Sequence, residues 1–236
     1  IIPTLIIIFI FKYYIWKLLP SSNSRKKNLL KKLSLIFSLI ILLSSCSKKK
    51  DKIEIYLTKN RIVQEGIDLR KIPNFKELDT LELIKMMPYT TYDTIHEEFI
   101  YAGKFDAKES QLEESPLVND DEIVNLDIIN HSLKIKKSDA KKIYDLKVNM
   151  RYGHQFVITI NKKPIFTGYF WDNLSSYVSA WNCIEYTHNR KINSELTSDF
   201  YLYKTNGMKK FRRTNVDYND FPNLTDAFKE TNRLNK

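Results

Sequence analysis

The sequence predicts an α+β fold: a single domain with a largely antiparallel sheet and two to four helices, preceded by a hydrophobic leader. Short segments in which apolar and polar residues alternate recur through residues 53–236, as in half-buried strands. Segments with the spacing of an amphipathic helix stand between some of them. At roughly 180 residues, this part of the chain is long enough for one domain around one core.

The strands are predicted from the two-residue period, beginning with residues 53–57. The clearest signal is a hairpin, in which HQFVITIN (154–161) and PIFTGYF (164–170) flank the turn Asn161-Lys162-Lys163-Pro164. Further strands are predicted at 97–105, 122–128, 132–136, 182–187 and 200–204.

The helices are predicted from apolar residues three and four positions apart, at 74–87, 106–114, 139–149 and 223–234. Asp106 and Ser138 are expected to cap the second and the third of these helices. Pro88 is expected to end the first helix, and Gly153 to end the third element.

A basic stretch, an apolar run and a cysteine follow one another near the start of the chain. Residues 25–32 contain five Arg and Lys, and residues 33–43 (LSLIFSLIILL) are apolar but shorter than a membrane span of about 20 residues. Leu43-Ser44-Ser45-Cys46 comes next. This tetrad resembles the lipobox of bacterial lipoprotein precursors, whose signal peptide is removed just before the cysteine.

The resemblance implies a diacylglycerol thioether on Cys46, cleavage between Ser45 and Cys46, and acyl chains such as palmitate that hold the exported protein to a membrane of the cell envelope. Ser47 stands after the cysteine instead of Asp, which by the same resemblance favours the outer membrane over the inner one. The alternative interpretation is an ordinary signal anchor with a chance cysteine.

The chain is accordingly divided into four parts. Residues 25–45 are interpreted as the signal peptide, 46–52 as the lipidated cysteine with a basic tether, and 53–236 as the exported domain. Residues 1–24 precede the first methionine, Met86, and are interpreted as upstream translation or as an additional apolar segment.

The basic excess belongs to the leader and the tether. The whole chain carries 38 Lys and Arg against 28 Asp and Glu, but residues 53–236 hold equal numbers of both, so no nucleic-acid partner is predicted. Within the domain, residues 93–127 have a net charge of −9 and residues 134–213 of +10. Such halves either steer a charged partner or fold onto each other as neighbouring strands.

One further resemblance concerns the centre of the domain. The order of helix 138–149, Gly153, strand 156–160, turn and strand 165–169 resembles part of the periplasmic head domain of SecD, an accessory subunit of the Sec translocase. It covers some 35 residues and rests on the pattern of elements. The resemblance implies an α+β fold outside the cytoplasm.

The sequence contains no catalytic, metal-binding or nucleotide-binding motif. The four histidines stand far apart, and five glycines in the whole chain form no phosphate-binding loop. Cys183 lies in an apolar segment and is expected to be a buried small hydrophobe. No catalytic residue, metal or cofactor is therefore predicted.

Aromatic residues are dense between positions 166 and 186. Tyr and Trp suit the core of a sheet and also binding sites, because they bring large contact areas with little conformational entropy. Trp171, Tyr177 and Trp181 are the candidate binding surface. Trp171 and Tyr177 are expected to be the exposed pair, on a turn after Phe170.

These observations together favour a non-enzymatic envelope lipoprotein, anchored through acylated Cys46, that binds another protein or an envelope polymer, for example as an immunity or accessory protein. Two alternatives stay open. One is an envelope hydrolase that acts on peptidoglycan or glycans, and the other is a structural component of an export or assembly machine.

Overall fold

The computed structural model describes residues 51–66, 89–94, 97–188, 190, 197–205 and 213–235, which all belong to the unit that spans residues 50–236. The leader, Cys46, the tether up to Lys50 and the helix predicted at 74–87 lie outside the described residues. Within the described part, no helix is both long and apolar enough to cross a membrane.

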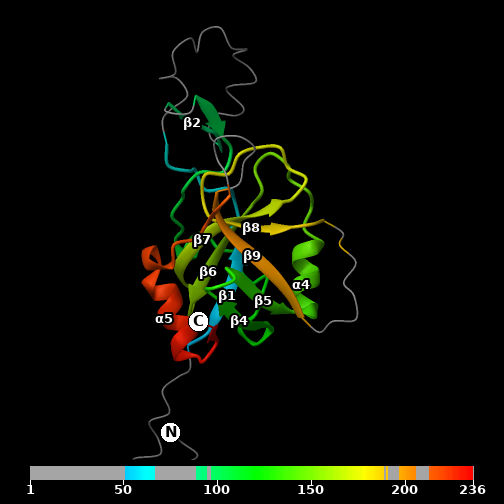
Figure 1. The fold of residues 1–236 in the computed structure, drawn as a ribbon, viewed down its shortest axis with the longest axis vertical. Helices are drawn as coiled ribbons and strands as arrows, with labels where there is room; N and C mark the ends of the chain where they lie inside the picture. Colours follow the sequence, from blue (N-terminus) through cyan, green and yellow to red (C-terminus); the bar gives the residue numbers. More distant parts are fainter. Residues whose placement is uncertain are drawn as a thin grey trace, which may run out of the picture. The chain divides into compact units, whose positions relative to one another are not determined.

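A mixed nine-stranded sheet forms the centre of the domain, in the order β1-β6-β7-β8-β9-β5-β4-β11 with β10 paired to β9 (Figure 1). Strands β2 and β3 form a separate two-stranded sheet. The strands are β1 (Ile53–Leu57), β2 (Thr91–Asp93), β3 (Glu98–Ile100), β4 (Ile123–Asp127), β5 (Ser132–Lys136), β6 (His154–Ile160), β7 (Lys163–Asp172), β8 (Cys183–Tyr186), β9 (Thr197–Thr205), β10 (Thr214–Asn215) and β11 (Leu234–Asn235). Two α-helices, α4 (Lys137–Tyr144) and α5 (Pro222–Glu230), complete an α+β fold.

The sheet is not purely antiparallel. Strand β8 runs parallel to β7, and β11 runs parallel to β4, whereas the other paired strands are antiparallel. The long connection from β7 to β8 carries the chain back to the side of the sheet from which β7 started, and this return makes a parallel pair possible.

The predicted hairpin is confirmed as β6 and β7, with Ile160 opposite Lys163. Its turn contains two residues, Asn161 and Lys162, at φ +50° and +68°. Positive φ at both central positions matches the right-handed twist of the flanking strands, and asparagine tolerates that conformation well. Strand β7 therefore begins at Lys163, one residue earlier than predicted.

Helix α4 is shorter than predicted and its cap is different. Lys136 occupies the N-cap position and Ser138 lies inside the first turn, where its Oγ donates to Glu122 Oε2 at 2.5 Å. The helix ends at Tyr144 instead of continuing to Asn149. Gly153 does not end it, but has φ +60° just before β6.

The segment 106–114 does not form the predicted α-helix. It contains one short 3-10 turn at Glu109–Gln111, preceded by Lys108 rather than capped by Asp106. Its backbone bonds to the edge of β1 instead, because the N–H of Lys59 donates to the carbonyl of Gln111 and that of Glu113 to the carbonyl of Leu57. Hydrogen bonds to the edge of β1 thus take the place of the intrahelical hydrogen bonds that were predicted for this segment.

Two other predicted elements are shorter than expected. Of the strand predicted at 97–105, only Glu98–Ile100 forms β3. The helix predicted at 223–234 ends at Glu230, and Leu234 pairs with β4 as part of β11. The strands predicted at 53–57, 122–128, 132–136, 182–187 and 200–204 are confirmed within two or three residues at their ends.

Both faces of the central strands are buried. Along β6, Phe156 and Ile158 belong to the larger core, together with the helices α4 and α5, while Val157 between them belongs to a second, smaller core. The second core lies beneath the segment 101–118 and contains Tyr56, Ala102, Phe105, Leu112, Val157, Tyr169, Trp171 and Cys183. Two-sided burial explains why aromatic residues are so dense in β7.

The oppositely charged halves of the domain meet as neighbouring strands, since β4 of the acidic half pairs with β5 at the start of the basic half. The acidic residue Asp120 is used structurally: its Oδ1 accepts from Arg233 Nη2 at 2.6 Å and from the Ile53 N–H at 2.8 Å. The carboxylate thereby joins the beginning of β1 to the C-terminal strand.

Candidate binding surface

The prediction that Trp171 is exposed is wrong. Strand β7 extends through Trp171 to Asp172, so Trp171 lies in a strand and not on a turn. Its side chain is 1% exposed and packs edge-on to the Tyr169 ring in the second core. Tyr177 and Trp181 are half-buried.

Tyr177 and Trp181 have different neighbours. The Trp181 Nε1 donates to Thr167 Oγ1 at 3.0 Å, and its ring lies 6.2 Å from the Phe221 ring at the start of α5. Tyr177 packs against Tyr101, with ring centroids 4.8 Å apart. The three predicted residues therefore do not form one surface, but Tyr177 belongs to another set of aromatic side chains.

This set, here called the tyrosine cluster, consists of Tyr89, Tyr101, Tyr152 and Tyr177. The Tyr152 ring lies 5.9 Å from that of Tyr89 and 6.0 Å from that of Tyr101, and Tyr101 makes the contact with Tyr177. The four residues come from the segments before β2, after β3, before β6 and after β7. All four residues are half-buried.

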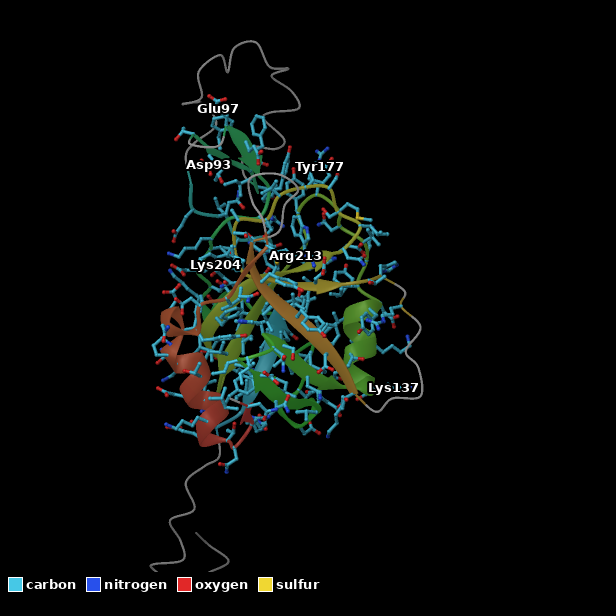
Figure 2. The ribbon with its side chains drawn as sticks, viewed as in Figure 1. Asp93, Glu97, Lys137, Tyr177, Lys204 and Arg213 are labelled. Carbon is cyan, nitrogen blue, oxygen red and sulfur yellow. The ribbon has the colours of Figure 1, made fainter. Side chains whose placement is uncertain are left out.

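Figure 2 shows Tyr177 at the opposite end of the domain from Lys137, the first residue of α4. The cluster is therefore built on the loops at one end of the sheet, where binding residues are commonly found on a rigid scaffold.

Arg61 lies among these rings. Its guanidinium carbon is 5.8 Å from the centre of the Tyr89 ring, 4.9 Å from that of Tyr152 and 5.3 Å from that of the buried Tyr169. Such contacts stabilise a cation through the negative face of each ring. Burial lowers the pKa of Arg61, and the surrounding tyrosines oppose that shift.

The hydrogen bonds of Arg61 go to backbone carbonyls. Nη1 donates to the Tyr152 carbonyl at 2.9 Å, and Nη2 donates to the Tyr101 carbonyl at 2.9 Å. No carboxylate of the described residues forms an ion pair with it. Within the described part of the chain, the groups that contact the guanidinium are therefore neutral.

A second arginine extends the cluster outward. Arg151 is exposed, and its guanidinium carbon lies 5.4 Å from the centre of the Tyr177 ring. Its Nη2 donates to the Tyr177 hydroxyl at 3.4 Å, and this hydrogen bond is the main reason why its pKa is raised. The surface therefore presents aromatic rings with two cations.

The backbone that carries these residues is fixed by long-range hydrogen bonds. The Tyr101 N–H donates to the Val178 carbonyl at 3.3 Å, and the Ala180 N–H donates to the Ala102 carbonyl at 2.9 Å, which joins the segment after β3 to the loop after β7. The rings of Tyr101 and Tyr177 are held against each other by this pairing.

A buried polar network fixes the segment that contains Arg61. The side chain of Gln155 accepts from the Ile62 N–H at 2.6 Å and donates to the Ile62 carbonyl at 2.9 Å. It also donates to the Tyr169 hydroxyl at 3.3 Å, which itself donates to the Gly103 carbonyl at 2.8 Å. The position of the surface is therefore set by the core of the sheet.

A small cleft of about 170 Å³ opens beside Arg61. It is lined by Leu57, Thr58, Arg61, Asn149, Gly153, His154 and Gln155. No acidic residue is among the lining residues, and Arg61 belongs both to the cleft and to the ring contacts of the tyrosine cluster.

The side chain of His154 is hydrogen-bonded to the backbone, and that of Cys183 is buried. His154 Nε2 is hydrogen-bonded to the Lys147 carbonyl, and no three metal-ligating side chains gather anywhere in the described ranges. Cys183 is buried as predicted, and burial raises the pKa of its thiol to about 12, which keeps it protonated.

Sequence reasoning identified one member of the tyrosine cluster, Tyr177. It missed Tyr89, Tyr101, Tyr152 and Arg61, which stand outside the aromatic-rich stretch 166–186. The local signals are weak and differ: Tyr89 follows the helix predicted at 74–87, Tyr101 lies within the strand predicted at 97–105, and Tyr152 precedes the strand predicted at 154–161.

Comparison with known proteins gives no match to a family model, to a curated protein or to a solved structure. The functional argument for this chain accordingly rests on its own residues and their contacts.

Proposed function

We propose that this chain is a membrane-anchored envelope lipoprotein whose domain binds a partner protein without catalysis, and that the tyrosine cluster is the centre of its binding surface. The observation that carries the proposal is the convergence of four half-buried tyrosines and two arginines from separate loops at one end of the sheet. Tyrosine and arginine are the residues most enriched among those that dominate protein–protein binding energies.

The physical state of the cluster supports a binding role. The rings are held in place by the backbone pairing of residues 101–102 with 178–180, so little conformational entropy is lost when a partner docks. Large apolar side chains are also exposed nearby in the chain: Val63 is 65% exposed, two residues after Arg61, and Leu174 is 73% exposed, three residues before Tyr177.

The anchoring part of the proposal rests on the residues around Cys46. It is tested by growth of cells that express the full chain with labelled palmitate, in parallel with Cys46→Ala. Label is expected on the wild-type protein and absent from Cys46→Ala. Equal labelling of both proteins would refute lipidation at this cysteine.

The binding part is tested by chemical cross-linking in intact envelopes, followed by capture of the tagged full chain and mass spectrometry. The variants are Tyr177→Ala and Tyr101→Ala, with Tyr201→Ala as the matched control, because Tyr201 is 50% exposed on β9 and makes no contact with the cluster. One dominant protein partner is expected with wild type and Tyr201→Ala, at least tenfold reduced in the two cluster variants.

Two results would contradict the proposal. Equal capture by all variants would exclude the tyrosine cluster as the contact surface. Absence of a protein partner, together with sedimentation of the domain on cell-wall polymer, would favour the alternative of a glycan-binding protein or hydrolase.

A further inference from the structure

Among the described residues, no carboxylate forms an ion pair with Arg61. Its bonds to the carbonyls of Tyr101 and Tyr152 use Nη1 and Nη2, and Nε has no hydrogen-bond partner among the described residues. Burying a cation costs free energy unless the cation is paired with an anion. The ring faces and the carbonyl oxygens around Arg61 offset part of this cost, but they do not neutralise its charge. A negatively charged group near Arg61 would be strongly favoured.

The cleft beside Arg61 is suited to such a group. None of its lining residues is acidic, and Arg61 is one of them. Asn149 lines the cleft, and its Oδ1 already accepts from the Tyr152 N–H at 3.2 Å, so the group that this amide can offer to a ligand is its NH₂ donor. The cleft therefore offers two kinds of hydrogen-bond donor, a positive charge and no competing carboxylate of its own.

We infer that this cleft receives the carboxylate of an aspartate or glutamate side chain from the partner protein, an inference that rests on the proposed function. Hydrogen bonds from a guanidinium to a carboxylate are about twice as strong as neutral ones. The tyrosine rings around Arg61 pack against the stem of that side chain. Arg151, exposed at the side of Tyr177, attracts the acidic partner during approach.

The test variant is Asn149→Asp, which places a carboxylate in the cleft without removing Arg61. The new side chain still accepts from the Tyr152 N–H, as Asn149 does, so the loop keeps its anchor. The introduced carboxylate pairs with Arg61 and repels a second carboxylate. Asn173→Asp is the matched control, because Asn173 is exposed on the loop after β7 and does not line the cleft.

The first measurement uses a defined probe on the full chain in detergent micelles. An acetylated tetra-glutamate amide is titrated while the Arg61 Nε–H resonance is followed by NMR, with the tetra-glutamine amide as the uncharged reference. The glutamate peptide is expected to shift this resonance in wild type and Asn173→Asp, and not in Asn149→Asp. A shift of equal size with the glutamine peptide, or no shift in wild type, would overturn the inference.

The second measurement repeats the cross-linked capture in envelopes with the same two variants. Asn149→Asp is expected to reduce capture at least tenfold, and Asn173→Asp to leave it within twofold. If Asn149→Asp captures the partner as well as wild type while Tyr177→Ala does not, the carboxylate site is refuted and the binding surface stands. If Tyr177→Ala also captures normally, the proposed function itself fails.

Discussion

The guanidinium carbon of Arg61 lies 4.9 Å from the centre of the Tyr152 ring, and Nη1 of the same arginine donates to the carbonyl oxygen of Tyr152 at 2.9 Å. The two residues are 91 positions apart in the chain. One side chain therefore binds both the ring and the backbone of the other, and links the segment after β1 to the loop before β6. The proposed binding surface and the stability of these loops depend on the same contact.

Replacement of Arg61 should weaken the fold as well as the surface. Arg61→Met keeps the apolar stem but leaves the carbonyls of Tyr101 and Tyr152 without their donors, so the free energy of unfolding should fall by about 2 kcal/mol. Arg61→Lys keeps the charge and should lose less. Urea unfolding followed by tryptophan fluorescence measures both. Arg190→Met is the control: Arg190 is exposed and has one ring contact, at 6.0 Å from the centre of Tyr144, so its replacement should change the stability by no more than about 1 kcal/mol.

Alkaline pH should destabilise the domain through Tyr169. Burial raises its pKa to about 12, above the usual value near 10, so the folded state holds the phenolic proton more tightly than the unfolded state. The resulting stabilisation is fully present below about pH 10 and is lost as the pH rises from about 10 to about 12; it amounts to about 3 kcal/mol.

Urea unfolding at about pH 9 and about pH 11 measures this loss in wild type and Tyr169→Phe. The variant should be less stable at the lower pH, because it lacks the bond to the Gly103 carbonyl, but its stability should fall less between the two values. An equal fall in both proteins would assign the alkaline loss to other groups, such as Tyr186, whose pKa is also raised to about 12 by burial.

The thiol of Cys183 should be unreactive in the folded protein. It is 1% exposed, and burial raises its pKa to about 12. Near pH 8 the sulfur is therefore not accessible to a reagent, and the thiol is not deprotonated to the reactive thiolate. In a full chain with Cys46→Ala, a maleimide should label Cys183 only at the rate of unfolding, and completely in urea. Rapid stoichiometric labelling of the native protein would contradict this placement.

Tyr218→Phe should leave the stability unchanged or raise it by up to about 1 kcal/mol. The Tyr218 hydroxyl is buried and has no hydrogen-bond partner in the described part of the chain, so its removal relieves an unsatisfied polar group. The ring itself stays stacked on His131, with centroids 5.6 Å apart. Thermal unfolding measures the effect, and a loss above about 1 kcal/mol would reveal a bond that the hydroxyl makes.

Local patterns predicted most strands of the domain but not all of its helical segments. The β6–β7 hairpin was predictable because alternation and turn residues lie within a few positions of each other. Segment 106–114 was not, because its backbone groups bond to β1, some fifty residues earlier in the chain. Hydrophobic periodicity describes the secondary structure that a segment prefers by itself. It contains no information about a distant strand that competes for the hydrogen bonds of that segment.

Most residues of the candidate surface could not be predicted from the sequence either, because they are brought together by long-range contacts. Trp171 was assigned to a turn because the end of β7 has no local signal, whereas the structure continues that strand as far as Asp172. Tyr101 and Tyr177 meet because their segments pair in parallel, at the bridge between Ala102 and Ser179. That bridge joins residues 77 positions apart, beyond the reach of any motif.

The sequence alone determined the α+β class, the β6–β7 hairpin and the burial of Cys183, since each follows from hydrophobic periodicity and turn chemistry within one segment. Only the tertiary structure decided the strand order, the two parallel pairs, the ends of the helices and the formation of the tyrosine cluster next to Arg61. These depend on which distant segments compete successfully for the same strand edges and the same buried space, and that competition is settled by the whole chain at once.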